Sequence, residues 1–138
     1  MTAPAFLRVS YADLNARQEN FNFAKLAARL ADFGYTCLRL SDDWQGADLL
    51  ACHVDGQQIL RVQLKGRAAV DRKYEGKDIH IGFFDGADAY VYPHDLFLAH
   101  VIARGSMDPA AGLWRDKGIR SWPRLPRWAQ DWLAPYAV

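Results

Sequence analysis

The sequence has few cysteines, no long apolar run and almost no net charge, and each lack excludes a class of protein. Only two of its 138 residues are cysteine, too few for a disulfide framework or a thiolate-rich zinc site. No apolar run approaches the ~20 residues of a membrane span. The N-terminus also lacks the basic start and apolar core of a signal peptide. We therefore expect a cytoplasmic protein with no membrane partner.

Near-neutral charge means that the overall composition does not indicate a nucleic-acid partner. The net charge is +1, with 51% apolar and 24% charged residues, as in an ordinary domain that buries a core. Any nucleic-acid surface must therefore come from local clustering of basic residues. No internal repeat or linker appears. We expect one domain over residues 1–138, with a core at about 13–104 and a tryptophan-rich C-terminal extension over 105–138.

A β-hairpin is predicted in the middle of the chain. Residues 48–54 are mostly apolar, residues 58–65 alternate, and Asp55-Gly56 between them is a strong two-residue turn signal. With that loop, the numbers of facing residues sum to 111. Asp48 then faces Gln63, and Lys65 is a diagonal neighbour within reach of Asp48. A three-residue bulged turn would shift the register by one and remove the facing pair.

Asp48, Gln63 and Lys65 project from one face of this hairpin, because side chains alternate along a strand. The carboxylate and the amide oxygen can share a hard divalent cation, Mg²⁺ or Mn²⁺. Lys65 beside the ion can orient or deprotonate a water, or stabilise charge on a phosphate. The alternative is a surface hairpin that happens to carry these common surface residues.

Together with its flanking elements, this motif resembles the PD-(D/E)xK nuclease superfamily, and within it the Mrr-like restriction endonuclease branch. The resemblance covers roughly residues 19–92. Its parts are a helix ending in Phe33-Gly34-Tyr35, a strand Thr36–Leu40, a loop ending in Gly46-Ala47-Asp48, and the hairpin ending in Val62-Gln63-Leu64-Lys65.

The resemblance implies roles for three residues in a metal-dependent nuclease. Asp48 and Gln63 would bind Mg²⁺, and Lys65 would assist the attack of water on a phosphodiester. Two positions depart from the common pattern. Ala47 replaces a frequent proline, and Gln63 replaces an acidic residue, although Gln-x-Lys is known among Mrr-like enzymes.

Glu19 is a further candidate ligand on a predicted helix over residues 14–33, with Asp13 as N-cap and Gly34 as the stop. It lies on the apolar stripe of that helix, where an unpaired carboxylate is costly to bury. Glu19 therefore either lies at the open end of the sheet or joins the site. In several PD-(D/E)xK nucleases a glutamate from this helix contacts the metal, and the resemblance gives Glu19 that role. The alternatives are a solvated first-turn glutamate or replacement by Gln18.

A cluster of basic residues follows the motif, with six basic and two acidic residues over the seventeen positions from 61 to 77. Its place beside the proposed site favours contact with phosphates over a solvated charged loop. The residues expected to contact nucleic acid are Arg61, Arg67, Arg72, Lys73 and Lys77.

Other polar and aromatic residues are assigned mainly to structure. Asp42 and Asp43, in an expected turn over residues 41–46, are predicted to cap that turn rather than bind metal. Trp44 either stacks on a base or closes the edge of the core. Cys37 and Cys52 are expected to be small buried hydrophobes, and His80 is expected to be a structural or exposed residue rather than a general acid or base. The four tryptophans beyond Leu113 are expected to anchor the tail rather than to form a base-stacking platform.

The fold expected is a single α/β domain, a restriction-endonuclease-like core with a mixed central sheet of about five strands flanked by helices. Further strands are predicted over 78–84 and 87–92, then a helix from Pro93 and a short helix Arg127–Leu133.

The expected function is a metal-dependent endonuclease acting on DNA. A catalytically decayed module that binds nucleic acid or a protein, and a prophage- or immunity-type accessory protein, stay open as alternatives. Because no separate DNA-reading domain is present, we expect a homodimer, recognition of DNA structure or a recruiting protein.

Overall fold

The structure, a computed structural model, describes residues 3–138 and contains four α-helices and seven strands in that range. The helices are α1 (Gln18–Ala31), α2 (His94–Ala103), α3 (Gly112–Lys117) and α4 (Arg127–Leu133). The strands are β1 (Tyr35–Trp44), β2 (Ala47–His53), β3 (Ile59–Leu64), β4 (Ala68–Asp71), β5 (Ile79–Asp85), β6 (Asp88–Pro93) and β7 (Ile119–Trp122). Short 3₁₀ helices are η1 (Ala12–Arg17), η2 (Arg72–Tyr74) and η3 (Ala134–Tyr136).

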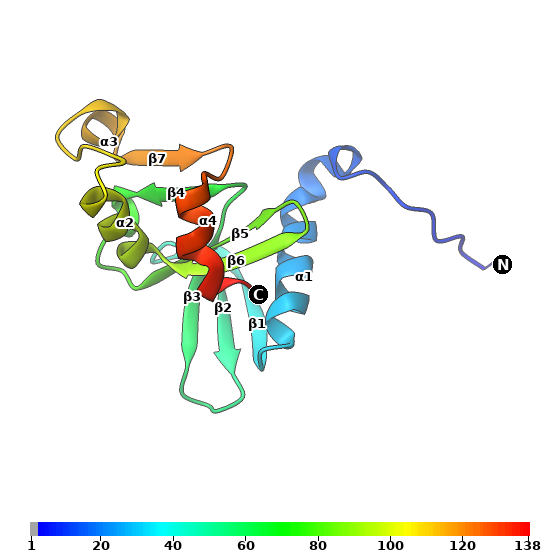
Figure 1. The fold of residues 1–138 in the computed structure, drawn as a ribbon. Coiled ribbons are helices and arrows are strands. Elements are labelled where there is room, and N and C mark those ends of the chain that lie inside the picture. The colour runs from blue at the N-terminus through cyan, green and yellow to red at the C-terminus, as the bar shows by residue number, and fades with distance from the viewer. Residues whose placement is uncertain (1–2) are drawn as a thin grey trace.

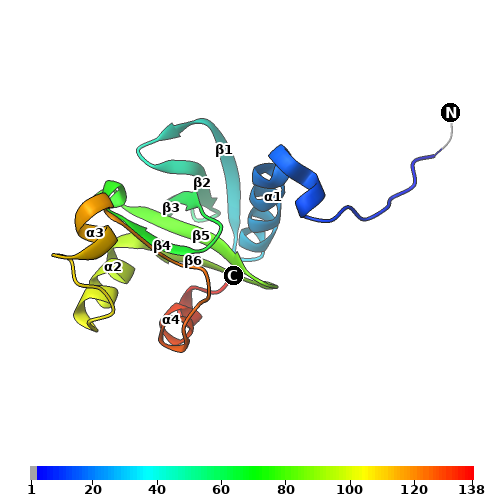
Figure 2. The same ribbon diagram turned by 90° about the horizontal axis from the view of Figure 1, so that it is seen from above.

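A five-stranded mixed sheet in the order β1-β2-β3-β5-β6 forms the centre of the molecule (Figure 1). Helix α1 covers one face, while α2, α4 and the two-stranded sheet β4–β7 lie on the other (Figure 2). The β3–β5 pairing is parallel and the other pairings in this sheet are antiparallel. The expectation of a single α/β domain with a five-stranded mixed sheet and flanking helices is confirmed.

The central hairpin forms in the predicted register. Paired residues of β2 and β3 run from Leu49↔Val62 to Cys52↔Ile59, so their numbers sum to 111. The Asp55 carboxylate accepts hydrogen bonds from the N–H groups of Gln57 and Gln58 at 2.8 and 2.9 Å. These bonds hold the pKa of Asp55 at about 2. A side chain that satisfies its own turn in this way fixes the loop and therefore the register.

Two hydrophobic cores lie on the two faces of the sheet. Under α1, the buried residues Leu26 and Leu30 of the predicted stripe pack on the strands. This smaller core comprises Leu26, Leu30, Leu49, Ala51, Val62, Ala89 and Val91. The opposite core is larger and includes Trp114, Trp122, Leu125, Ala129 and Leu133 from the C-terminal segment.

The C-terminal tryptophans anchor the tail, as predicted. Trp114 and Trp122 are buried, and Trp128 stacks on Phe97 with ring centroids 6.1 Å apart. Trp132 is tilted against the same Phe97 ring at 5.1 Å. Helix α4 also has the predicted bounds. Because these rings contact one another and α2, they do not form a base-stacking platform.

Side chains at the end of β6 hold the segment that follows Lys65. The Tyr92 hydroxyl donates to the Ala69 carbonyl at 2.6 Å and accepts from the Ala69 N–H at 2.9 Å. The buried His94 accepts from the Asp71 N–H through Nε2 at 2.9 Å. Its Nδ1, 2.8 Å from Asp95, therefore carries the proton and donates to that carboxylate. Strand β4 is thus fixed against the end of the sheet.

Several local predictions were wrong. Asp13 does not cap the first helix, which begins as η1, kinks at Asn15 (φ 52°) and becomes regular α-helix only from Gln18. The residues expected as a turn over 41–46 belong largely to β1, and Cys37 and Cys52 are half-buried free thiols.

Strands β4 and β7 were not predicted because each is short and pairs only with the other, far along the chain. Such a pairing leaves little local pattern. None of the helices within residues 3–138 has both the length and the apolar character needed to cross a lipid bilayer.

Gly82 provides a test of how closely α1 approaches the sheet. A Cβ at this position would lie 2.6 Å from Leu26 Cδ2 and 3.2 Å from Val62 Cγ1, both in the smaller core. Gly82→Ala should therefore lower the free energy of unfolding by about 1–3 kcal/mol through overpacking. Urea denaturation measures this change.

The matched control is Gly66→Ala. Gly66 has open space within 4 Å of its would-be Cβ and no positive φ, so the change should stay within about 0.5 kcal/mol. Equal stability of the two variants would show that α1 yields to the added methyl group.

Candidate functional site

The candidate site begins where β2 and β3 part. The paired residues end at Leu49↔Val62, and beyond them the Leu64 N–H donates to Asp48 Oδ2 at 2.9 Å. The carboxylate thus takes the place of a backbone acceptor. One Asp48 oxygen is held by the end of β3, and the side chain is fixed at the opening between the strands.

A polar pocket of about 340 Å³ lies at this opening and brings together the four predicted site residues Glu19, Asp48, Gln63 and Lys65. They come from α1, β2, β3 and the residue that follows β3. The Lys65 N–H donates to the Gly82 carbonyl at 2.9 Å, which continues the parallel β3–β5 pairing. The complete lining is Glu19, Asn22, Arg39, Leu40, Ser41, Asp42, Asp43, Asp48, Gln63, Leu64, Lys65 and Gly66.

The pocket disfavours the ionised forms of both Asp48 and Lys65. Burial raises the pKa of Asp48, and the nearby Asp43 and Glu19 add to the rise, against the opposing Leu64 N–H and Lys65. Burial also lowers the pKa of Lys65, and the neighbouring Lys73 lowers it further. Perturbation of this kind in a pocket is typical of functional sites.

Lys65 is positioned by an aromatic ring rather than by a direct ion pair. Its Nζ lies 5.3 Å from the ring centroid of the buried Tyr74, and Lys73 Nζ lies 5.2 Å from the same ring. Within residues 3–138, no ion pair joins Lys65 to Asp48. Lys65 therefore remains able to contact a bound molecule.

Glu19 lies at the rim of the pocket rather than on the buried apolar face. Its side chain is 86% exposed and lies 3.7 Å from the guanidinium of Arg39. Glu19 is therefore not buried on the apolar stripe, and its role as a metal ligand stays a prediction. Gln18 points elsewhere and donates to the Tyr11 carbonyl at 3.1 Å.

Asp43 lines the pocket from β1, so the prediction that it caps a turn was wrong. Gln45 and Gly46 both have positive φ, 54° and 88°, and pair Trp44 with Ala47 in a tight hairpin. Asp43 lines the pocket with Asp48, and its charge contributes to the raised pKa of Asp48. The sequence signal for this hairpin was the Gln45-Gly46 pair, because the tight turn needs positive φ at both of its central positions. Asp42 also lines the pocket.

Of the predicted phosphate-contacting residues, some are free to contact a phosphate and others are engaged in contacts within the protein. Lys73 lies close to Lys65 over Tyr74, and Arg67 and Lys77 are exposed. Arg61 donates to the Lys77 carbonyl at 3.2 Å. Arg72 instead donates to the Trp114 carbonyl and lies over its ring at 5.4 Å, so it fastens α3.

Two residues left open by the sequence can also be placed. Trp44 is 50% exposed and lies under the guanidinium of Arg61 at 5.2 Å, so it does not close the core edge. His80 lies outside the pocket. Burial lowers its pKa, and its buried Nδ1 has no hydrogen-bond partner among residues 3–138.

The donor set of the pocket fits a hard divalent cation only in part. Asp48 and Gln63 offer oxygen atoms, and Mg²⁺ is commonly bound by one or two carboxylates, water and substrate phosphate. Among residues 3–138, no group of three or more His, Cys, Asp or Glu side chains is arranged to hold a metal. A cation here would therefore depend on water and substrate for most of its ligands.

Comparison with known proteins gives a distant structural similarity. No family model matches the chain, and no curated protein matches it. The chain is similar to a solved structure titled a bacterial homing endonuclease, I-Ssp6803I, with a TM-score of 0.43 and 24% identity. The match covers 58% of this chain and 65% of that chain, just under two thirds.

Replacing Asp48 tests whether its negative charge destabilises the folded protein. Because the pKa of Asp48 is raised in the folded protein, its contribution to stability is fully present below pH 3.8, its ordinary pKa. That contribution is lost as the pH rises through the pKa of the folded state. Asp48→Asn keeps an acceptor for Leu64 and removes the charge, so it should be more stable than wild type at pH 7. That gain should shrink as the pH falls towards 4. Thermal unfolding across this range measures it.

The matched variant Asp48→Ala removes the acceptor as well. It leaves the Leu64 N–H without its partner and should be about 1–3 kcal/mol less stable than Asp48→Asn. A gain for Asp48→Asn that is independent of pH would contradict the proposed electrostatic origin.

Proposed function

We propose that this protein is a metal-dependent nuclease that hydrolyses phosphodiester bonds in DNA, with a PD-(D/E)xK-type site of the Mrr-like branch. The observation that carries the proposal is the polar pocket where β2 and β3 part, lined by Asp48, Gln63 and Lys65 with Glu19 at its rim. One fixed carboxylate, one amide and one perturbed lysine are the groups that such hydrolysis needs.

Asp48 and Gln63 would hold Mg²⁺ or Mn²⁺, with Glu19 as a further ligand. When bound, the ion neutralises charge on the phosphate and makes water a better nucleophile. The hydrogen bond from Leu64 orients the Asp48 carboxylate. Glu19 is engaged with Arg39 at the rim, so its contribution requires the exchange of an exposed ion pair, which costs little.

Lys65 would act on the attacking water or on the phosphate. The lowered pKa increases the fraction of neutral amine, which can accept a proton from water. In its charged form the same Nζ donates to a phosphate oxygen and stabilises developing negative charge. Tyr74 below the lysine limits its movement in either case.

Phosphates flanking the scissile bond would be bound by Lys73, Arg67 and Lys77, with Arg61 beside them. Arg72 is omitted because Trp114 engages it. One pocket cuts one strand, so cleavage of a duplex requires a homodimer, two binding events or a recruiting protein. We propose a cytoplasmic location on the basis of the sequence.

A second candidate is a nucleic-acid-binding module of the same fold that does not cleave. The observation in its favour is that no group of three or more metal-binding His, Cys, Asp or Glu side chains is found in residues 3–138. Such a module would retain DNA with strong salt dependence and would not respond to divalent cations by cutting it. An accessory protein without a nucleic-acid role would do neither.

The first test is cleavage of mixed DNA and RNA substrates with Mg²⁺, Mn²⁺ or EDTA. We expect metal-dependent cleavage of DNA that falls at least about 100-fold in Asp48→Asn and Lys65→Ala, because each removes a charge used in the transition state. Glu19→Gln should lose less, since Glu19 is a rim residue.

Lys117→Ala is the matched control, an exposed lysine of α3 outside the pocket. It should cleave as wild type does. DNA binding without cleavage under every metal condition would favour the second candidate instead.

Metal affinity gives a separate prediction. The Gln63 amide offers a dipole where a carboxylate would add a full charge beside Asp48, so the free protein should bind the ion weakly. Gln63→Glu should tighten Mn²⁺ binding, and Asp48→Asn should abolish it. Activity need not rise with affinity, because added negative charge repels the substrate phosphate. Calorimetric titration with Mn²⁺ measures this; equal binding by wild type and Asp48→Asn would remove Asp48 as a ligand.

A further inference from the structure

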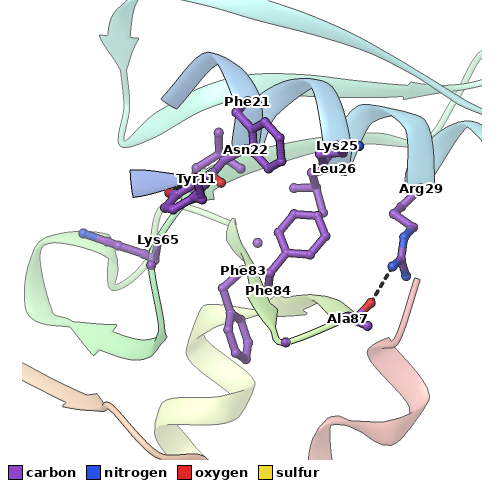
Figure 3. Close-up of a pocket in the computed structure, with 14 residues that line it drawn as sticks. Tyr11, Phe21, Asn22, Lys25, Leu26, Arg29, Lys65, Phe83, Phe84 and Ala87 are labelled. Atoms are coloured by element: carbon purple, nitrogen blue, oxygen red, sulfur yellow. Dashed lines mark hydrogen bonds between the residues drawn. The ribbon is translucent and has the colours of Figure 1, made fainter. Parts of the chain in front are cut away.

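A second, more apolar groove lies beside the polar pocket. It has a volume of about 450 Å³ and runs between α1 and the β5–β6 hairpin (Figure 3). Four residues line both spaces: Asn22, Leu64, Lys65 and Gly66. A molecule that extends out of the polar pocket past Lys65 therefore enters this groove.

Aromatic rings from three separate segments converge on the groove. Figure 3 shows Tyr11 from the segment before η1, Phe21 from α1 and Phe84 from β5 around it. Tyr11 and Phe21 meet edge to face, with centroids 5.5 Å apart. Both rings are substantially exposed, 46% for Tyr11 and 38% for Phe21. Phe83 belongs mainly to the opposite core, where its ring stacks on Tyr90.

The charged residues that line the groove are all basic. They are Lys25, Arg29 and Lys65, and no aspartate or glutamate is among the lining residues. Lys25 Nζ lies 5.3 Å from the Phe21 centroid, and Arg29 Cζ lies 5.9 Å from the Phe84 centroid. The Arg29 guanidinium donates to the Val138 and Ala87 carbonyls, so Lys25 and Lys65 are the cations left to contact a phosphate. Rings interleaved with cations bind bases by stacking and the linking phosphates by charge.

Glycines leave the groove open beneath these rings. Gly66, Gly82 and Gly86 line it and contribute no side chain to fill it. At Gly66 and Gly86 nothing lies within 4 Å of the position that a Cβ would take, whereas Gly82 is closely covered by Leu26. The volume falls within the range of about 300–1,000 Å³ typical of small-molecule sites. A nucleobase with its sugar can therefore be accommodated, whereas a base pair within an intact duplex cannot present one face to these rings.

Tyr11 is held in place by residues of α1. Its hydroxyl accepts from Asn22 Nδ2 at 2.9 Å, and its carbonyl accepts from Gln18 at 3.1 Å. Asn22 also lines the polar pocket. The tyrosine is therefore a fixed wall of the groove that is linked to the site where cleavage is proposed.

We propose that this groove binds an unstacked base of the DNA strand whose phosphate occupies the polar pocket, so that the preferred substrate is single-stranded or locally unpaired DNA. This inference rests on the proposed nuclease function and specifies its substrate. The continuity of the two spaces, the aromatic lining and the wholly basic charge of the groove carry it.

The test uses a single-stranded oligonucleotide with 2-aminopurine in place of one base, in the presence of EDTA so that no cleavage occurs. Stacking on the rings should quench its fluorescence on binding. Phe21→Ala and Lys25→Gln should each weaken binding, the former about tenfold, and Phe21→Ala should restore fluorescence. Because Phe84 is half-buried, Phe84→Leu is used there to keep the packing while removing the ring.

Phe33→Ala is the matched control, an exposed phenylalanine beyond the end of α1 that does not line the groove. It should bind as wild type does. A fully paired duplex of the same sequence should bind more weakly than the single strand. A free deoxynucleoside monophosphate should not displace the oligonucleotide at comparable concentration.

Three results would overturn the inference: unchanged affinity in Phe21→Ala and Phe84→Leu, tighter binding of the duplex, or displacement by the monophosphate. They can be separated from failure of the proposed function. Quenched, ring-dependent binding without metal-dependent cleavage rejects the nuclease and retains the base groove. Cleavage with no effect of the ring variants rejects the groove alone.

Discussion

The hydrogen bond from the Leu64 N–H to the Asp48 carboxylate is the interaction on which the candidate site depends. It ends the β2–β3 pairing one step beyond Leu49↔Val62 and allows the two strands to part. Asp48 is thereby oriented by the backbone of the strand that carries Gln63 and precedes Lys65. A half-buried N–H that lacked this acceptor would carry a desolvation cost, so the same bond stabilises both the strand end and the site.

The surroundings of that bond make the site electrostatically costly. Asp43 and Glu19 approach Asp48, burial disfavours its charge, and Lys65 is similarly disfavoured beside Lys73. The rest of the fold holds these groups together. Strand β4 is fixed by Tyr92 and His94, and the tryptophans of the C-terminal segment complete the larger core. Rigid layers on both faces of the sheet therefore support a pocket whose charged groups would separate in a looser chain.

Local sequence patterns predicted the elements that are defined by local interactions. The Asp55-Gly56 turn and the alternation of residues 58–65 fixed the hairpin register, because a slip of one residue would turn Val62 out of the core. The stripe of Leu26 and Leu30 and the bounds of α4 followed from helical periodicity. The β4–β7 sheet and the kinked start of the first helix were missed, since the former depends on a distant partner and the latter on an unusual backbone angle at Asn15.

The sequence by itself predicted that Asp48, Gln63 and Lys65 lie close together at the end of one hairpin, because strand alternation and one tight turn are enough to place them there. The expected facing pair of Asp48 and Gln63 is not formed, because the strand pairing ends at Leu49↔Val62 and Asp48 accepts from the Leu64 N–H instead. Only the tertiary structure decided what surrounds them. Packing α1 on the sheet brought Glu19 to the rim, and the Gln45-Gly46 hairpin turned Asp43 towards Asp48. The contact with Trp114 engages the guanidinium of Arg72, which stays exposed but is held against α3. The aromatic groove likewise combines Tyr11, Phe21 and Phe84 from distant segments, and such convergence follows from the packing of whole elements rather than from local spacing.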